Sequence, residues 1–233
     1  EGEPIQAVFH SSGGGYTEAA SAVWGKDIPY LQAVPDYDQD SPKFSWNRVF
    51  TKVQLTRLLS QGGYELGDLQ GIRLSARTAP PMRWTPDRGT SGRVKRMTFV
   101  GSKKSITLTG SQVRSLLDLD SALFDIRIGL ERPKELDVTI TNGYGYPIGK
   151  KTIPISGDKK SGTEGASVGD MRLFTNVDGE KVIFTGNGFG HGVGLSQWGA
   201  RGMALQKNKR GKHNDYKTIL SHYYQGITVK QVY

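Results

Sequence analysis

The stretch GNGFGHGVGLSQWGA, residues 186–200, is the most informative part of this sequence. Five of the nine residues in 186–194 are glycine, so the backbone can adopt positive φ angles and approach another group closely. The stretch lies between a predicted strand at 182–185 and a predicted helix from 195 to about 206, with Ser196 as its expected N-cap. A glycine-rich loop leading into a helix is typical of a site for an oxygen-rich ligand. A tight structural turn and a simple helix cap remain open alternatives.

Two side chains in this stretch could contact such a ligand. His191 can donate or accept hydrogen bonds or carry a proton, although a buried hydrogen-bonded imidazole explains it equally well. Trp198 could stack on the apolar face of a sugar or a base. Several common loops are excluded. The segment lacks the second glycine of the nucleophile elbow around Ser196, and it lacks the lysine of a phosphate-binding loop. It also lies too near the C-terminus for a first dinucleotide-binding unit.

Composition narrows the class of protein. The chain has 233 residues, a formal charge of +9, 31 glycines and no cysteine. Absence of cysteine excludes disulfides, thiolate nucleophiles and cysteine-ligated zinc sites. The basic balance favours an anionic partner such as nucleic acid, a cell-wall polymer or lipid headgroups. No apolar run approaches the roughly 18 residues that span a bilayer.

Strands and helices are mixed without a βαβ rhythm, which predicts an α+β fold of mainly antiparallel strands with a few short helices around a cleft. We expect helices capped by Thr17, Thr51 and Ser111, and a C-terminal helix at 216–224. Loops are expected at 26–45 and 156–169. Expected strands cover 5–9, 46–50, 66–77, 94–100, 105–109, 124–130, 136–141, 146–155, 182–185 and 227–232.

Residues 190–204, GHGVGLSQWGARGMA, resemble the signature of the stage II sporulation protein D family, which includes the amidase enhancers of bacterial cell walls. The segment FHSSGGGYTE at 9–18 is similar to the family's serine-glycine loop. Residues 23–25, 29–31 and 216–226 also resemble the family, whereas residues 60–180 do so only loosely. The resemblance therefore covers both ends of the chain.

The resemblance implies a bacterial, secreted protein that works on peptidoglycan during wall remodelling or sporulation. Members of the family are lytic transglycosylases. They cleave between N-acetylmuramic acid and N-acetylglucosamine, leave a 1,6-anhydro end, and prefer strands whose stem peptides have been removed. The implied partners are glycan strands and a cell-wall amidase, not nucleic acid. The implied location is outside the cytoplasm, with membrane contact only through a removed N-terminal segment.

The resemblance also implies a catalytic glutamate in a segment of the type Pro-x-Glu-x-Leu-Lys-Ala-Gln. These residues contain no such segment, so we expect the acid to lie upstream of Glu1 and leave the catalytic residue unknown. Glu18 is the nearest substitute, although a charge in the first turn of a helix explains it more simply. With no cysteine and scattered histidines, we expect no metal and no cofactor.

The resemblance further divides the chain. Residues 1–60 and 180–233 are expected to form the two halves of the cleft, with residues 61–179 as a β-rich middle region or insertion. Aromatic residues would stack on sugar rings, and the others would bind the glycan from the two sides. The expected substrate-binding residues are His10, Ser11, Ser12, Gly13, Gly14, Tyr16, Thr17, Trp24, His191, Gly192, Gly194, Ser196, Gln197 and Trp198.

Two alternatives to an enzyme remain. The first is a non-catalytic wall-binding module that stimulates an N-acetylmuramoyl-L-alanine amidase. The second is a nucleic-acid-binding protein, indicated only by net charge and by a basic cluster without a recognised motif. That cluster comprises Arg93, Lys95, Arg96, Lys103 and Lys104.

Overall fold

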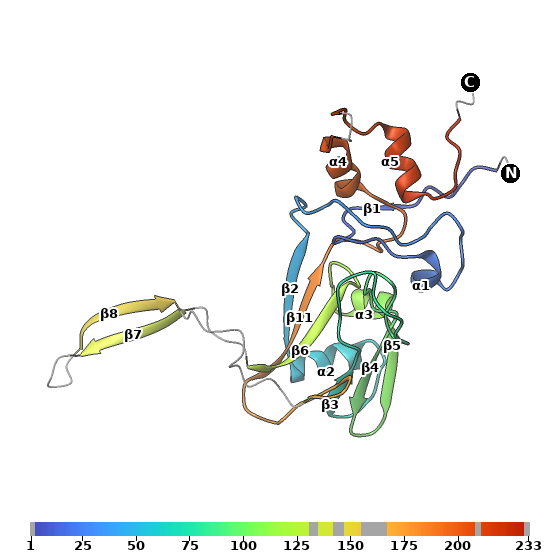
Figure 1. The fold of residues 1–233 in the computed structure, drawn as a ribbon. Helices are drawn as coiled ribbons and strands as arrows, with labels where there is room; N and C mark the ends of the chain where they lie inside the picture. Colours follow the sequence, from blue (N-terminus) through green and yellow to red (C-terminus); the bar gives the residue numbers. More distant parts are fainter. Residues whose placement is uncertain (1–2, 131–134, 142–146, 155–166, 208–210, 231–233) are drawn as a thin grey trace.

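The computed structural model describes residues 3–130, 135–141, 147–154, 167–207 and 211–230. It has the mixed α+β architecture that the sequence predicts (Figure 1). The five helices are α1 (Ala20–Trp24), α2 (Lys52–Gln61), α3 (Gly110–Leu116), α4 (Gln197–Leu205) and α5 (Tyr216–Tyr223) in the described residues. The described strands are β1 (Phe9–His10), β2 (Ser45–Thr51), β3 (Leu69–Arg73), β4 (Arg96–Gly101), β5 (Ser105–Thr109), β6 (Phe124–Leu130), β7 (Glu135–Thr141), β8 (Pro147–Pro154), β9 (Ser167–Val168), β10 (Met171–Leu173), β11 (Glu180–Asn187) and β12 (Leu195–Ser196).

The strands within the described residues form four separate sheets. Three of them are antiparallel, and two of these share one core, with orders β2-β11-β6 and β5-β4-β3-β10-β9. The β7-β8 hairpin stands away from the rest of the molecule (Figure 1). The fourth sheet is the short parallel pair β1-β12, which joins the two ends of the chain.

The larger hydrophobic core lies between the first two sheets and helices α2 and α3. It includes Leu55 and Leu59 from α2, Phe99 from β4, and Phe124 and Phe184 from the three-stranded sheet. The Phe124 and Phe184 rings meet edge to face, with centroids 5.3 Å apart. Alternation along β6 buries every second residue at its start, as expected for a half-buried strand.

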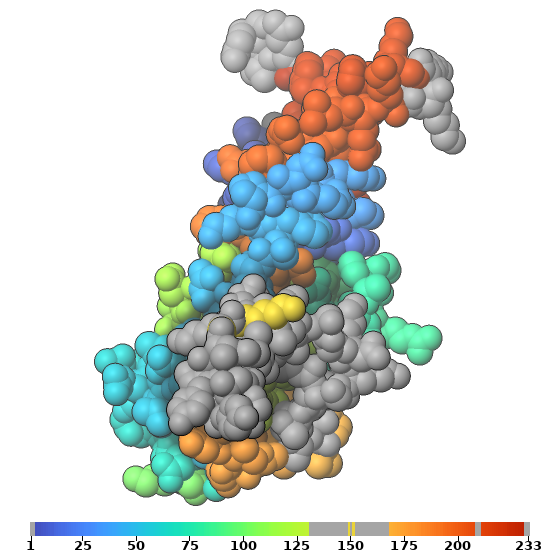
Figure 2. Space-filling model, turned by 90° about the vertical axis from the view of Figure 1, so that its left-hand side faces the viewer, coloured from blue at the N-terminus to red at the C-terminus, as the bar shows by residue number. Residues whose placement is uncertain are grey.

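The smaller hydrophobic core joins α4, α5 and the N-terminal segment. Met203, Ile219 and Tyr223 pack there against Ala20 and Leu31. The C-terminal helices form one end of the molecule, and residues just before β11 lie at the other (Figure 2). The division at residues 61 and 179 stays a prediction.

Helix boundaries follow local capping, although not always at the expected residue. Thr51 accepts a hydrogen bond from the Gln54 amide and completes a capping box, as its position predicts. Ser196 caps α4 by accepting from the Gly199 amide, 3.1 Å away. The prediction of a Ser111 cap was wrong, because Thr109 two residues earlier forms a capping box with Gln112.

Several expected helix and strand boundaries also differ from the structure. Thr17 does not cap α1, because its hydroxyl pairs with the backbone of Val34 and the helix begins at Ala20. The strand expected at 5–9 is reduced to β1, and the one at 66–77 to β3. Two short strands, β9 and β10, occur at 167–173, where part of the expected loop lies. Residues 227–230 form no strand; 231–232 lie outside the described residues, as does most of the expected 156–169 loop.

Candidate functional site

The two glycine-rich segments of the sequence lie side by side. Strands β1 and β12 pair in parallel, with Phe9 opposite Leu195 and His10 opposite Ser196. Further along, Ser12 and Phe189 exchange two backbone hydrogen bonds of 3.1 and 2.9 Å. The Trp198 amide also donates to the Ser11 carbonyl. The serine-glycine loop and the glycine-histidine loop therefore form one continuous surface.

The glycines allow this close approach. Gly192 has a φ of +82°, and a Cβ atom there would lie 2.1 Å from the guanidinium carbon of Arg93. Gly194 has a φ of +70°, and its Cβ would lie 2.3 Å from the Val8 carbonyl oxygen. At both positions an L side chain would be strained and would also collide with a neighbour. The spacing of glycines in 186–194 thus reflects loop-to-loop packing.

Three aromatic rings meet at the junction of the two loops. The His191 ring lies 5.4 Å from His10 and 5.3 Å from Trp24, measured between centroids. Trp24 is 44% exposed and His191 is half-buried, so both reach solvent. His10 is 5% exposed and lies behind them. The structure therefore brings His10 and His191, which the sequence places on the two sides of the expected cleft, next to one another, although only His191 lines the neighbouring pocket.

Hydrogen bonds define the state of both imidazoles. His10 Nδ1 lies 3.2 Å from the Val193 carbonyl oxygen, which only accepts, so Nδ1 carries the proton. His191 Nδ1 instead accepts from the Val193 amide at 3.1 Å, and the ring bonds to the Phe9 backbone as well. Burial lowers the pKa of His10 well below its usual value, and nearby Arg93 lowers it further. Burial also lowers the pKa of His191, so both rings are neutral at pH 7.

Arg93 lies beneath the loops and connects them. Its side chain is completely buried and donates to the carbonyls of Gly13 and Tyr16 at 2.8 and 2.9 Å. Burial lowers its pKa to about 10, so the guanidinium remains charged at pH 7. Glu18 and Asp36 oppose that shift, which makes them its electrostatic partners. A residue from the middle of the chain thus holds the N-terminal loop in position.

The surroundings of Glu18 indicate a structural role. Its carboxylate is fully buried and accepts from the Ser91 hydroxyl at 2.6 Å and from the amides of Ala19, Thr90 and Ser91 at 3.0–3.1 Å. Glu18 precedes α1 and does not belong to its first turn, so the interpretation as a first-turn charge was wrong. With four donors already bound, its oxygens are not free to protonate a substrate. Glu18 instead joins α1 to residues 90–91.

Two buried aspartates hold the serine-glycine loop. Asp38 accepts from the Ser12 hydroxyl and from the amides of Gly14 and Gly15 at 2.7 and 2.8 Å. Asp36 accepts from the Gly13 amide at 3.0 Å and from the Tyr223 hydroxyl at 2.7 Å. Burial, followed by the charge of Asp38, raises the pKa of Asp36.

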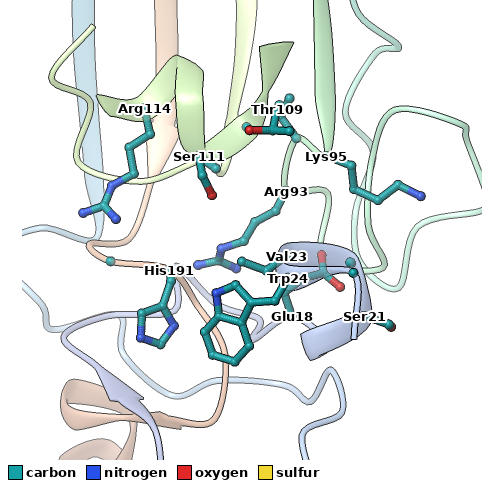
Figure 3. Close-up of a pocket in the computed structure, with 16 residues that line it drawn as sticks. Glu18, Ser21, Val23, Trp24, Arg93, Lys95, Thr109, Ser111, Arg114 and His191 are labelled. Carbon is teal, nitrogen blue, oxygen red and sulfur yellow. The ribbon is translucent and has the colours of Figure 1, made fainter. Parts of the chain in front are cut away.

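A pocket of about 360 Å³ opens beside the aromatic cluster. Trp24 and His191 form one side, and Thr109 and Ser111 the opposite side, with Arg93 between them (Figure 3). Its volume is within the range of small-molecule sites. The described residues contain no group of three or more histidine, aspartate or glutamate side chains that could hold a metal ion.

Comparison with known proteins gives the family. Residues 30–149 match the family model described as a domain of unknown function, DUF8618. The chain is 28% identical over 98% of its length to the amidase enhancer of Bacillus subtilis and also to stage II sporulation protein D of that organism. Stage II sporulation protein D of Bacillus amyloliquefaciens is likewise 28% identical over 99% of the chain. The chain belongs to the DUF8618 family. Its similarity to these three relatives supports the assignment to the stage II sporulation protein D family.

The match covers only part of these relatives. The chain spans 30% of the amidase enhancer and 46% of each sporulation protein, so it corresponds to less than half of their lengths. Within the residues that the structure describes, no helix has both the length and the apolar character needed to cross a bilayer.

The residues expected to bind substrate in this family member separate into two groups. Several reach the surface, where a ligand could contact them: Ser11, Tyr16, Trp24, His191, Gln197 and Trp198. The rest are buried and shape the loops: His10, Ser12, Gly13, Gly14, Thr17, Gly192, Gly194 and Ser196. Trp198 also carries the Arg201 guanidinium 5.2 Å above its ring. Direct contact with a ligand remains a prediction for the surface group.

Sequence reasoning missed the charged residues under the loops. The sequence places Arg93 in a basic cluster with four other cations, but Arg93 is 1% exposed and belongs to the interior. Asp36 and Asp38 lie in the expected loop at 26–45, yet both are buried. The sequence does contain a signal for these buried aspartates. The consecutive backbone amides of glycines 13–15 need hydrogen-bond acceptors once the loop is buried. Neighbouring aspartates in the chain could supply them.

Proposed function

We propose that this chain binds peptidoglycan glycan strands and acts in cell-wall remodelling, as part of a lytic transglycosylase. The juxtaposition of the 9–18 and 190–198 loops around His191 and Trp24 carries the proposal. Relatives named amidase enhancer and stage II sporulation protein D support a role at the cell wall. We propose action outside the cytoplasm for the same reason.

The surface suits a neutral, oxygen-rich ligand. Trp24 offers a ring for the apolar face of a sugar, and the neutral His191 offers polar atoms beside it. Gln197 is exposed at the start of α4 and can bind sugar hydroxyls or acetamido groups. These residues would hold a glycan across the joined loops and keep its bonds in a fixed position.

Cleavage needs a group that these residues do not supply. A carboxylic acid must protonate the glycosidic oxygen, and the resulting carboxylate can take the proton of the muramic C6 hydroxyl, which closes the anhydro ring. The buried carboxylates of Glu18, Asp36 and Asp38 are bound to protein donors. We propose that the family's Pro-x-Glu-x-Leu-Lys-Ala-Gln segment, which does not occur in residues 1–233, provides the acid.

The test uses the natural full-length protein and purified peptidoglycan without stem peptides. Mass spectrometry should detect products ending in 1,6-anhydromuramic acid. His191→Ala should reduce their rate of formation by about 100-fold through lost positioning, whereas His213→Ala, at an exposed loop, should not. Binding without any anhydro product would contradict the enzymatic part of the proposal.

A second candidate is stimulation of a cell-wall amidase without cleavage of glycan. The relative named amidase enhancer favours it. The measurement is release of stem peptides by a purified amidase with and without this protein, alongside sedimentation with insoluble wall material. Stimulation together with wall binding, in the absence of anhydro products, would select this candidate.

A further inference from the structure

We propose that the pocket beside Trp24 and His191 is an anion site that binds a carboxylate carried on the wall strand, through Lys95 and Arg114. The inference rests on the proposed function and adds the chemical class that the site selects. The joined loops recognise the neutral sugar, whereas this pocket recognises a charge attached to it.

The charges that line the pocket carry this inference. Its lining includes three cationic side chains, Arg93, Lys95 and Arg114, and one carboxylate, Glu18. Since His191 has a lowered pKa and is neutral, it adds no charge at pH 7. The formal balance of the lining is therefore positive, which favours an anionic ligand.

The one carboxylate cannot neutralise the outer cations. Glu18 is fully buried and directs its oxygens to residues 90 and 91 and to the Ala19 amide. It is also a main electrostatic partner of buried Arg93. Since Glu18, Asp36 and Asp38 are all acidic neighbours of Arg93, the excess positive charge of the lining lies with Lys95 and Arg114.

Lys95 and Arg114 lie on opposite sides of Arg93 (Figure 3). Within the described part of the chain, the Lys95 ammonium group makes no hydrogen bond or ion pair. Arg114 uses only its Nε, which donates to the Leu119 carbonyl at 3.3 Å. Its two terminal nitrogens are thus available for a ligand oxygen. Because both side chains are half-buried, a bound carboxylate would be less screened than on an open surface.

The other residues that line the pocket suit the sugar that would carry the carboxylate. Trp24 and His191 provide ring faces, and Ser21 and Ser111 provide exposed hydroxyls. A sugar bearing an acidic substituent combines these requirements. In peptidoglycan, the lactyl group of muramic acid is a free carboxylate on a bare strand and an amide when a peptide is attached. The stem peptide is the other source of carboxylates.

The experiment compares soluble glycan oligomers by calorimetry, using the natural full-length protein. One sample has free lactyl carboxylates, the second has them converted to methylamides, and the third retains its stem peptides. We expect the free-carboxylate strand to bind about tenfold more tightly than the methylamide, a difference of about 1.4 kcal/mol. Added salt should reduce this preference.

Substitutions test whether the pocket causes the preference for the free-carboxylate strand. Lys95→Gln and Arg114→Gln should each reduce it, and together they should abolish it without weakening binding to the methylamide strand. Arg114→Lys keeps the charge and should retain most of the preference. Arg96→Gln removes an exposed cation next to Lys95 outside the pocket, so it should change nothing.

The outcomes separate the two proposals. Equal affinity for free and methylamide strands would overturn the anion site and leave glycan binding intact. A preference that survives the double variant would also overturn it. Failure of every strand to bind would remove the proposed function as well. If the peptide-bearing strand binds as tightly and depends on Lys95 and Arg114, the anion site holds and the carboxylate comes from the peptide.

Discussion

The region around the joined loops and the region between the two larger sheets are stabilised by different means. The first has short helices, a two-residue strand pair, and buried charges at Arg93, Glu18 and Asp36. The second has regular strands around apolar side chains such as Phe99 and Phe184. An apolar core tolerates changes of similar volume, whereas a buried polar network fails when one partner is lost. The site should therefore be the more sensitive region to single substitutions.

The largest effect is expected for Arg93→Met. It leaves the carbonyls of Gly13 and Tyr16 without their donor and the buried Glu18 without its positive neighbour. We expect a loss of about 3–5 kcal/mol of unfolding free energy in urea titrations. Arg96→Met, at an exposed neighbouring position, is the control and should stay within about 0.5 kcal/mol of the parent. Similar stability for the two variants would contradict the comparison.

The second-largest loss of unfolding free energy is expected for Gly192→Ala. Gly192 and Gly63 have φ angles of +82° and +83°, but only the first has a neighbour, Arg93, in the way of a Cβ atom. Gly63→Ala should cost about 1–2 kcal/mol from the left-handed backbone alone. Gly192→Ala should cost more and should also lower glycan binding, measured by denaturation and calorimetry. If both variants lost the same unfolding free energy, Arg93 would have to move away from the added methyl group of Gly192→Ala without any cost.

The buried imidazoles predict a pH dependence. Burial lowers the pKa of His10 in the folded state, while the unfolded chain keeps a value near 6.5. The unfolded state thus binds more protons below that pH, and the stability contributed above about pH 6.5 is lost as pH falls toward the folded-state pKa.

The measurement is urea unfolding of the parent and His10→Asn from pH 8 to pH 5. The raised pKa of Asp36 gives the opposite slope, so the difference between the two proteins isolates His10. That difference should be constant above pH 7 and change by up to about 1.4 kcal/mol per pH unit below pH 6.5. Parallel curves over the whole range would show that His10 does not contribute.

The smallest effect is expected in the apolar core. Phe99→Leu replaces a fully buried ring by a smaller hydrophobic side chain, and neighbouring side chains can partly close the gap. We expect a loss of about 1 kcal/mol in urea unfolding and unchanged glycan binding. A loss as large as that of Arg93→Met would remove the contrast between the two regions.

The sequence predicted features that depend on local chemistry. The Thr51 and Ser196 caps, the half-buried alternation of β6 and the importance of the 186–194 glycines follow from neighbouring residues. The fold class followed from the order of such elements.

The missed features depend on partners far away in the chain. Glu18 binds residue 91, which is 73 positions later, and Thr17 pairs with Val34 instead of starting a helix. From the local pattern alone, a charged residue in a loop is expected to be exposed to solvent. Arg93 and Asp38 are nevertheless buried. Only the need of buried glycine amides for acceptors could have indicated them.

The pairing of β1 with β12 has a consequence for biosynthesis. His10 contacts the carbonyl of Val193, 183 positions further on, so the two loops meet only after most of the polypeptide has left the ribosome. Contacts of such long sequence separation form slowly, because the intervening chain must first be ordered. A nascent protein interrupted before residue 190 would contain the larger core yet have no complete surface for a glycan.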